Sequence, residues 1–281
     1  MPLQLAFESL GDGPPVVVLH GLFGSSRNWR GIARALSAEH RVICADLRNH
    51  GRSPWIDSMT YSEMAADVRA LIRSERLDRP VVIGHSMGGK TAMTLALESP
   101  ESVGRLIVVD IAPVLYADRL TPYVQAMLSL NPRAAADRAD VVRQMIERIP
   151  DAATVGFLMQ NLVVTNDHFD WQLNLPAIGA AIPELSAFPP ELAARRFDGP
   201  ATLITGSLSD YVTPADSAAF VEQFPQARTV EIDGAGHWVH ADQPAAFLAA
   251  LGLVPAIAAR AHAPPPADVQ RSALMFPWRP A

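Results

Sequence analysis

Apolar residues along the chain follow two different periods. Short apolar runs recur at residues 16–19, 41–45, 80–83, 106–109, 201–205 and 228–232. Runs of this length predict strands that are buried on both faces of a sheet. Between several of these runs, apolar positions return at helical spacing. This alternation predicts an α/β protein with a mostly parallel central sheet flanked by helices.

Two of the helical stretches have clear signatures. The segment 26–36 places Trp29, Ile32 and Leu36 on one face. Further along, Thr60 and Glu63 stand three residues apart at the start of an apolar pattern that continues to residue 72. This spacing is typical of a capping box, so we expect a helix to begin directly after Thr60.

The strand–helix alternation is interrupted between about residues 113 and 199. A helical pattern punctuated by prolines replaces it, and we expect a helical lid inserted over the edge of the sheet. Residues 1–112 and 200–253 would then form the core, and the Pro-rich residues 254–281 a disordered tail. The apolar residues of the insertion that we expect to select the substrate's acyl chain are Met127, Met145, Phe157, Met159 and Trp171.

A five-residue motif, GHSMG at residues 84–88, follows the apolar run at 80–83 and precedes a helix-forming segment. The G-x-S-x-G pattern between a strand and a helix is typical of a nucleophile elbow. A serine in a tight turn stands exposed where a base can reach it, and the flanking glycines relieve the crowding. The motif predicts Ser86 as a nucleophile, with Met87 N–H directed at the oxyanion.

The same peptide also satisfies a second motif. Residues 84–91, GHSMGGKT, match the phosphate-binding P-loop, in which Lys90 would contact the phosphates. Asp110, after the run at 106–109, could then bind magnesium. A serine hydrolase and a nucleotide hydrolase are therefore both open at this point.

Composition limits the partners. The 281 residues are 49% hydrophobic and 19% charged with a net charge of −6, which suits one large domain with an insertion. There is no basic run, so we expect neither nucleic acid nor membrane as a partner.

The single cysteine, Cys44, lies in an apolar run and is expected to be a buried thiol. The sequence shows no signal-peptide pattern and no apolar run of about 18 residues, and we expect a cytoplasmic protein.

Two loops favour the serine hydrolase. His237 lies in a glycine-flanked loop after the run at 228–232 and is the candidate base, whereas His240 fits the start of the next helix. An early loop at 20–24, HGLFG, would supply a second oxyanion donor, Leu22 N–H, with His20 as a brace. A P-loop enzyme requires neither loop.

Four motifs together resemble the α/β-hydrolase superfamily. They are HGLFGS at 20–25, DLRNHGRS at 46–53, GHSMGGK at 84–90 and GAGHWVH at 234–240. In detail they are similar to a branch of small intracellular esterases that hydrolyse short acyl esters and acyl-CoA thioesters. The resemblance covers about residues 14–253, places a lid at the interruption, and implies a structural role for residues 46–53.

The acid that orients the histidine has two candidates. Most family members carry it in a Gly-x-x-Asp pattern, but here Ser209 occupies that position and Asp210 comes one residue later. The branch named above also has a serine there and takes its acid from an earlier strand end, where Asp110 stands. Asp110 is our candidate, because a carboxylate at the end of a buried strand needs a partner. The resemblance adds Ser209 as a possible fourth member.

These observations predict a serine hydrolase that cleaves carboxylic esters or acyl thioesters of a small-molecule substrate. It would use Ser86, His237 and Asp110 and form an acyl-enzyme without a cofactor. No metal is expected, because His237 and His240 have no third ligand at recognisable spacing. A cofactor-free haloperoxidase and a ligand receptor on the same fold stay open as alternatives.

Overall fold

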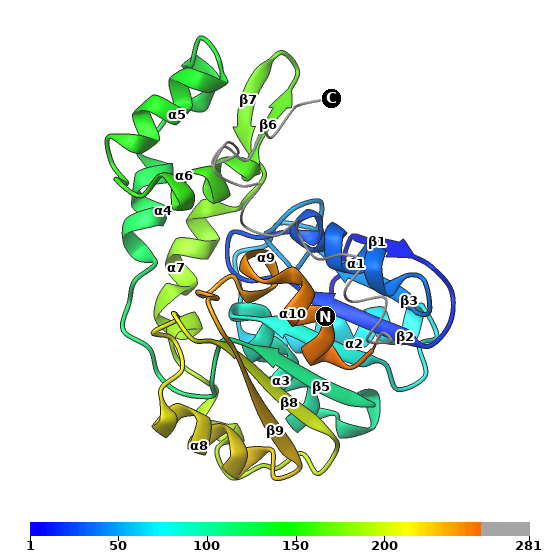
Figure 1. Ribbon diagram of the computed structural model, residues 1–281. Helices are drawn as coiled ribbons and strands as arrows, with labels where there is room; N and C mark the ends of the chain where they lie inside the picture. The colour runs from blue at the N-terminus through cyan, green and yellow to red at the C-terminus, as the bar shows by residue number, and fades with distance from the viewer. Residues whose placement is uncertain (254–281) are drawn as a thin grey trace, which may run out of the picture.

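The core of the protein is a twisted seven-stranded sheet in the order β1-β3-β2-β4-β5-β8-β9 (Figure 1). The computed structural model describes residues 1–253 of the chain. All neighbouring strands are parallel except β1, which pairs antiparallel with β3 at the edge. The strands are β1 Phe7–Leu10, β2 Pro15–Leu19, β3 Arg41–Ala45, β4 Val81–His85, β5 Arg105–Val109, β8 Ala201–Gly206 and β9 Ala227–Ile232.

Helices cover both faces of the sheet. On one face, Val17 and Leu19 of β2 join the apolar cluster that contains α2, α3 and α8. On the other face, Val16 and Val18 of the same strand pack with α1 and α10. The helices are α1 Arg30–Leu36, α2 Tyr61–Ser74, α3 Met87–Glu98, α8 Pro214–Gln223, α9 Val239–Asp242 and α10 Pro244–Leu251. The expected α/β-hydrolase architecture is confirmed.

Local sequence signals placed several of these elements correctly. The capping box is present at the start of α2, where Glu63 N–H donates to Thr60 Oγ1 at 3.2 Å and Thr60 N–H donates to Glu63 Oε2 at 3.0 Å. Cys44 is buried in β3, and burial raises the pKa of its thiol to about 12. It is therefore an unreactive core residue.

Between β5 and β8 lies a separate group of elements, residues 113–199, which we call the inserted segment. Figure 1 shows it gathered beyond one end of the sheet. Its helices are α4 Thr121–Leu128, α5 Arg138–Ile146, α6 Ala152–Leu158 and α7 Leu175–Ser186. It also contains an antiparallel hairpin of β6 Leu162–Thr165 and β7 His168–Trp171.

The helical expectation for the inserted segment missed this hairpin. Its two strands are only four residues long, and the turn residues Asn166 and Asp167 have φ of 47° and 65°. Such a two-residue turn depends on left-handed backbone that asparagine and aspartate tolerate. The edge strand β1 was also missed, because its half-buried pattern gives no continuous apolar run. The expected tail at 254–281 lies outside the described residues.

Among the helices of residues 1–253, none combines the length and the apolar composition that spanning a bilayer requires.

Candidate active site

Ser86 stands in the turn between β4 and α3, with φ 51° and ψ −119°. A non-glycine residue held in such a region costs about 1–3 kcal/mol. The flanking glycines are required: a Cβ on Gly84 would lie 2.1 Å from the Gly88 carbonyl oxygen. A Cβ on Gly88 would lie 2.5 Å from the His20 carbonyl oxygen. The turn places Ser86 at the carboxyl end of the sheet.

Asp110 directly follows β5 and is fully buried. Its Oδ2 accepts a hydrogen bond from Nδ1 of His237 at 2.7 Å, and its Oδ1 accepts one from Gly206 N–H at 3.2 Å. Because a carboxylate only accepts hydrogen bonds, Nδ1 of His237 carries the proton. Nε2 of His237 is then the nitrogen available to act as a base.

The two acid candidates lie in different surroundings. Ser209 donates its hydroxyl to Oδ2 of Asp110, so it joins the Asp110–His237 pair. Asp210 points away, with its side chain 72% exposed and paired with Arg119 of the inserted segment at 2.7 Å. The geometry brings together Asp110, Ser209 and His237, and it separates Asp210 from them.

The loop at 20–24 is braced by two neutral histidines, of which His20 is the first. Nδ1 of His20 donates to the Gly21 carbonyl oxygen at 2.8 Å, and Nε2 accepts Leu47 N–H at 2.9 Å. Burial lowers the pKa of His20. Both ring nitrogens are occupied, which fits a brace and not a base.

His50 is the second brace, and sequence reasoning did not single it out. Its Nδ1 donates to the Arg48 carbonyl oxygen at 2.9 Å, and its Nε2 accepts Phe23 N–H at 3.2 Å. Burial, with the neighbouring His20, lowers the pKa of His50 to about 3. The neutral ring can therefore keep accepting from Phe23, which has a strained φ of 61°.

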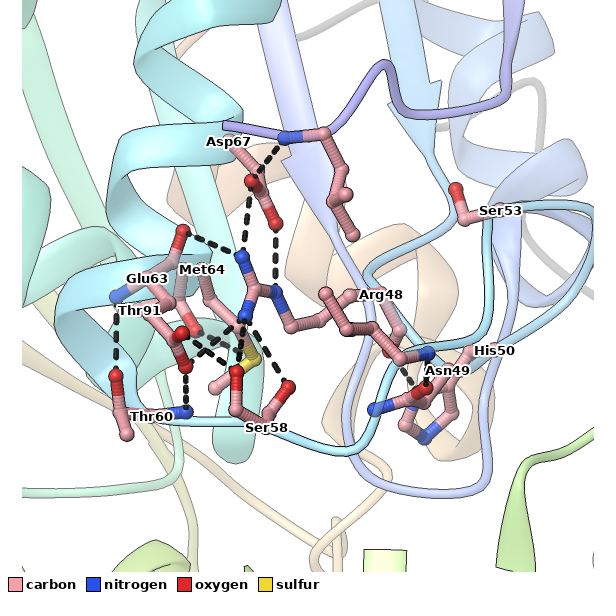
Figure 2. A network of polar contacts seen from close by, with 12 residues as sticks. Arg48, Asn49, His50, Ser53, Ser58, Thr60, Glu63, Met64, Asp67 and Thr91 are labelled. Atoms are coloured by element: carbon pink, nitrogen blue, oxygen red, sulfur yellow. Dashed lines mark hydrogen bonds and ion pairs between the residues drawn. The ribbon is translucent and has the colours of Figure 1, made fainter. Parts of the chain in front are cut away.

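A buried ion pair fixes the loop that carries His50 (Figure 2). Arg48 donates to Asp67 through Nε at 2.8 Å and Nη2 at 3.1 Å. Its Nη1 lies 2.9 Å from Glu63 Oε2, so α2 supplies both carboxylates. Leu3 N–H also donates to Asp67, at 2.6 Å. The structural role expected for residues 46–53 thus has a concrete form: it connects α2 to the loop at 20–24.

Two further histidines lie beside His237. Nε2 of His85 donates to the His237 carbonyl oxygen at 2.9 Å, and the His240 ring stacks on Trp29 at 4.1 Å. Burial lowers the pKa of His85 well below its usual range and that of His240 to about 3. Of these three rings in the described chain, His237 is the one bonded to Asp110.

The P-loop interpretation is wrong. Lys90 is buried in α3, and its Nζ donates to the carbonyl oxygens of Val114 at 2.9 Å, Ser186 at 2.8 Å and Ala187 at 2.7 Å. An ammonium has three donors, and all three are taken by the inserted segment. Burial lowers the pKa of Lys90 to about 7. No donor is left for a phosphate.

A cavity of about 320 Å³ opens onto Ser86 and His237. The core contributes Leu22 and Met87 to its wall, and the inserted segment contributes aromatic and aliphatic side chains. Of the five apolar residues expected to line an acyl pocket, Phe157 does so. Among the described residues, Met127, Met145 and Met159 are buried in the core away from the cavity, and Trp171 is partly buried against that core. The sequence spacing did not predict how the helices of this segment are oriented. It therefore could not distinguish the residue that lines the cavity from those that pack elsewhere.

Tyr211 is a second residue that the sequence did not reveal. It lies two positions after Ser209, and its ring stacks on His237 at 3.6 Å between centroids. The contact joins residues from loops after β8 and β9, and local pattern carries no signal for it. Among residues 1–253, no group of three or more His, Cys, Asp or Glu side chains could hold a metal ion.

Comparisons with known proteins identify the fold family. The model of the alpha/beta hydrolase fold family matches residues 14–244. The chain is 39% identical over 251 residues to the sn-1-specific diacylglycerol lipase ABHD11 of Xenopus tropicalis, covering 86% of this chain and 78% of that protein. It is 35% identical over 241 residues to esterase YbfF of Escherichia coli K12, covering 85% and 92%.

A solved structure is similar over nearly the whole chain. A marine microorganism esterase superposes with a TM-score of 0.86 at 37% identity, covering 90% of this chain and all of that one. Sequence and structure thus agree on one fold family, and the relatives quoted are named esterases or lipases. The chain belongs to the alpha/beta hydrolase fold family and is an ester-hydrolysing enzyme.

Proposed function

We propose that the chain hydrolyses carboxylic esters through an acyl-enzyme on Ser86, with His237 as general base and Asp110 as its orienting acid. The observation that carries the proposal is the hydrogen bond of 2.7 Å between Nδ1 of His237 and buried Asp110. It fixes the tautomer in which Nε2 can take a proton. Ser86 lines the same cavity as His237, so the nucleophile and base face one substrate.

The reaction proceeds in two steps. Ser86 Oγ attacks the acyl carbonyl as its proton passes to Nε2 of His237, which then protonates the departing alkoxide. In the second step His237 takes a proton from water as the hydroxide attacks the acyl carbon. The bond from that carbon to Ser86 Oγ then breaks, His237 returns the proton to Oγ, and the acid leaves. The carboxylate of Asp110 stabilises the imidazolium that forms in each step.

Two backbone donors would bind the developing oxyanion. Met87 is the first residue of α3, so its N–H has no partner within the helix. In the loop at 20–24, Phe23 N–H is bonded to His50 and Gly24 N–H to Gly21 O at 2.9 Å. Leu22 N–H is therefore the donor of this loop that we assign to the oxyanion hole. Removing one such donor lowers kcat by about 10²- to 10³-fold.

The cavity supports a neutral, largely apolar acyl group. Its described lining contains apolar and aromatic side chains from the inserted segment and no aspartate or glutamate. The charged lining residues are Lys90, saturated by carbonyl oxygens, and Arg119, paired with Asp210. We assign the inserted segment the role of a lid that selects the acyl chain of a small ester. Acyl thioesters offer the same carbonyl chemistry.

Active-site labelling and steady-state turnover test the proposal together. Fluorophosphonate should label the wild type, and Ser86→Ala should lose labelling and lower p-nitrophenyl acetate turnover by roughly 10³-fold or more. Ser217→Ala in α8, away from the cavity, is the matched control and should keep both. Labelling that persists in Ser86→Ala would refute the assignment. A panel of p-nitrophenyl esters, acyl-CoAs and a diacylglycerol then identifies the preferred substrate.

The alternatives make different predictions in the same assays. A ligand receptor on this fold would show labelling without steady-state turnover. A cofactor-free haloperoxidase would halogenate an acceptor such as monochlorodimedone in the presence of peroxide, bromide and a carboxylic acid, at a rate exceeding its ester hydrolysis.

A further inference from the structure

The loop at 207–211 contacts the Asp110–His237 pair in two places. Ser209 donates its hydroxyl to Asp110, and Tyr211 places its ring flat against His237, with centroids 3.6 Å apart and planes 14° from parallel. Tyr211 N–H also donates to Ser209 Oγ at 3.2 Å. One short loop therefore holds both the acid and the base, and the Ser209 contact accounts for only the first.

A hydrogen bond at Nδ1 does not fix an imidazole by itself. The ring of His237 can still rotate about the axis of its bond to Asp110, which would change the direction in which Nε2 faces the cavity it shares with Ser86. A flat aromatic surface at 3.6 Å opposes that rotation. His85 donates to the backbone carbonyl oxygen of His237 at 2.9 Å, so this bond does not restrain the imidazole ring. The stacked ring thus restrains a motion that the described hydrogen bonds of His237 leave free.

The ring of Tyr211 also presents its π face to a group that becomes a cation during the reaction. The face of an aromatic ring carries negative potential and attracts a cation near it. His237 becomes an imidazolium each time it takes a proton from Ser86 or water. We infer that Tyr211 is a positioning residue for His237, holding the imidazole in plane and stabilising the imidazolium through its π face.

The charged and titratable groups around His237 are consistent with this role. Asp110 at the end of β5 is its bonded carboxylate. His85 at the end of β4 and His240 in α9 are kept neutral, since burial lowers the pKa of each. Burial raises the pKa of the Tyr211 hydroxyl, so that group is neutral as well.

One cationic side chain of the described residues, Arg119, lies near the Tyr211 ring. The guanidinium of Arg119 lies 5.5 Å from the Tyr211 ring, and its Nη1 donates to both carboxylate oxygens of Asp210, at 2.8 and 2.7 Å, in an exposed ion pair that offsets its charge. The imidazolium is thus stabilised mainly by Asp110 and the Tyr211 ring. The Arg119–Asp210 pair also ties the inserted segment to the loop that carries Tyr211.

Two substitutions of Tyr211 distinguish the contribution of its aromatic face from that of its hydroxyl. Phenylalanine removes only the hydroxyl, and leucine replaces the ring with an aliphatic side chain. Tyr211→Phe should keep kcat within about twofold, and Tyr211→Leu should lower kcat by about 2- to 30-fold, the range of a cation–π contact. In Tyr211→Leu the acidic limb of the kcat/KM profile should move to lower pH, because protonated His237 loses a stabilising contact. Tyr123→Leu changes another cavity-lining tyrosine in the same way and should leave that limb in place.

A series of fluorinated side chains tests the aromatic face without changing the packing of the loop. Fluorinated phenylalanines at position 211 keep the shape of the ring while weakening its negative face. The acidic limb should move stepwise to lower pH with added fluorine. An acidic limb that stays fixed across this series and in Tyr211→Leu would overturn the inference.

The inference rests on the proposed function, and Ser86→Ala separates the two. If Ser86→Ala stays active, the proposed nucleophile fails. If Ser86→Ala is inactive while Tyr211→Leu matches the wild type in rate and pH profile, the role of Tyr211 alone is refuted.

Discussion

Replacing Asp110 by asparagine should disable the base without disturbing the fold. Asp110 accepts hydrogen bonds from Gly206 N–H at Oδ1 and from His237 and Ser209 at Oδ2. An asparagine has one oxygen and one NH₂ group to place among these three donors. Gly206 N–H is a fixed backbone donor, so the asparagine oxygen should face it and the NH₂ group should face His237.

That orientation forces the wrong tautomer. His237 must then accept at Nδ1 and carry its proton on Nε2, where it cannot receive one from Ser86. Ser209 can rotate its hydroxyl to accept from the amide, so the change is tolerated structurally. Loss of the orienting acid in this way lowers kcat by about 10³- to 10⁴-fold. This corresponds to about 4–5.5 kcal/mol of transition-state stabilisation.

The assay is steady-state hydrolysis of p-nitrophenyl acetate, with thermal unfolding to verify the fold. Asp210→Asn is the matched control: its carboxylate is exposed and paired with Arg119, so kcat should fall by less than about tenfold. A larger loss in Asp210→Asn than in Asp110→Asn would show that the acid was assigned to the wrong strand end.

Three further outcomes follow from the contacts described. Ser209→Ala removes a hydroxyl donor to the Asp110 carboxylate and should lower kcat by about tenfold at unchanged KM; an unaltered kcat would exclude that contact from catalysis. Phe157→Ala should move the optimum of a p-nitrophenyl ester series to longer chains, at about 0.8 kcal/mol per added CH₂, whereas buried Met145→Ala should lower stability only. The pKa of Lys90 is about 7 when folded against 10.5 unfolded, so the unfolded chain binds the extra proton between these values. Relative to Lys90→Met, wild-type stability in urea should therefore rise with pH across that window, by at most about 1.4 kcal/mol per unit; a flat difference would contradict it.

The sequence predicted those parts of the protein that depend on local pattern. The parallel strands were visible because strands buried on both faces are apolar throughout. The elbow at Ser86 was visible because the turn requires glycines at fixed positions: a Cβ on Gly84 would lie 2.1 Å from the Gly88 carbonyl oxygen. Asp110 could be favoured over Asp210 because the resemblance to the esterase branch implies an acid after the earlier strand, and because a carboxylate at the end of a buried strand needs a partner.

Contacts between distant segments were not predictable in this way. Phe157 and Met145 have the same apolar character, and only the packing of α5 and α6 decides that one lines the cavity and the other does not. The stacking of Tyr211 on His237 joins two loops after different strands. Lys90 satisfied a phosphate-binding motif, but carbonyl oxygens nearly 100 positions away occupy its ammonium.

Lys90 binds the start of the inserted segment and the end of α7 together, and this has an evolutionary and practical consequence. Val114 near the start of the segment and Ser186 at the end of α7 meet at one ammonium, and Tyr116 N–H bonds to Ser186 O at 3.0 Å. The helices α4 to α7 and the hairpin between them therefore begin and end at neighbouring points of the structure. Such a module can diverge, or be exchanged between relatives, while the machinery at the strand ends keeps its geometry. Chimaeras joined at these two points offer a direct route to enzymes with new acyl preferences.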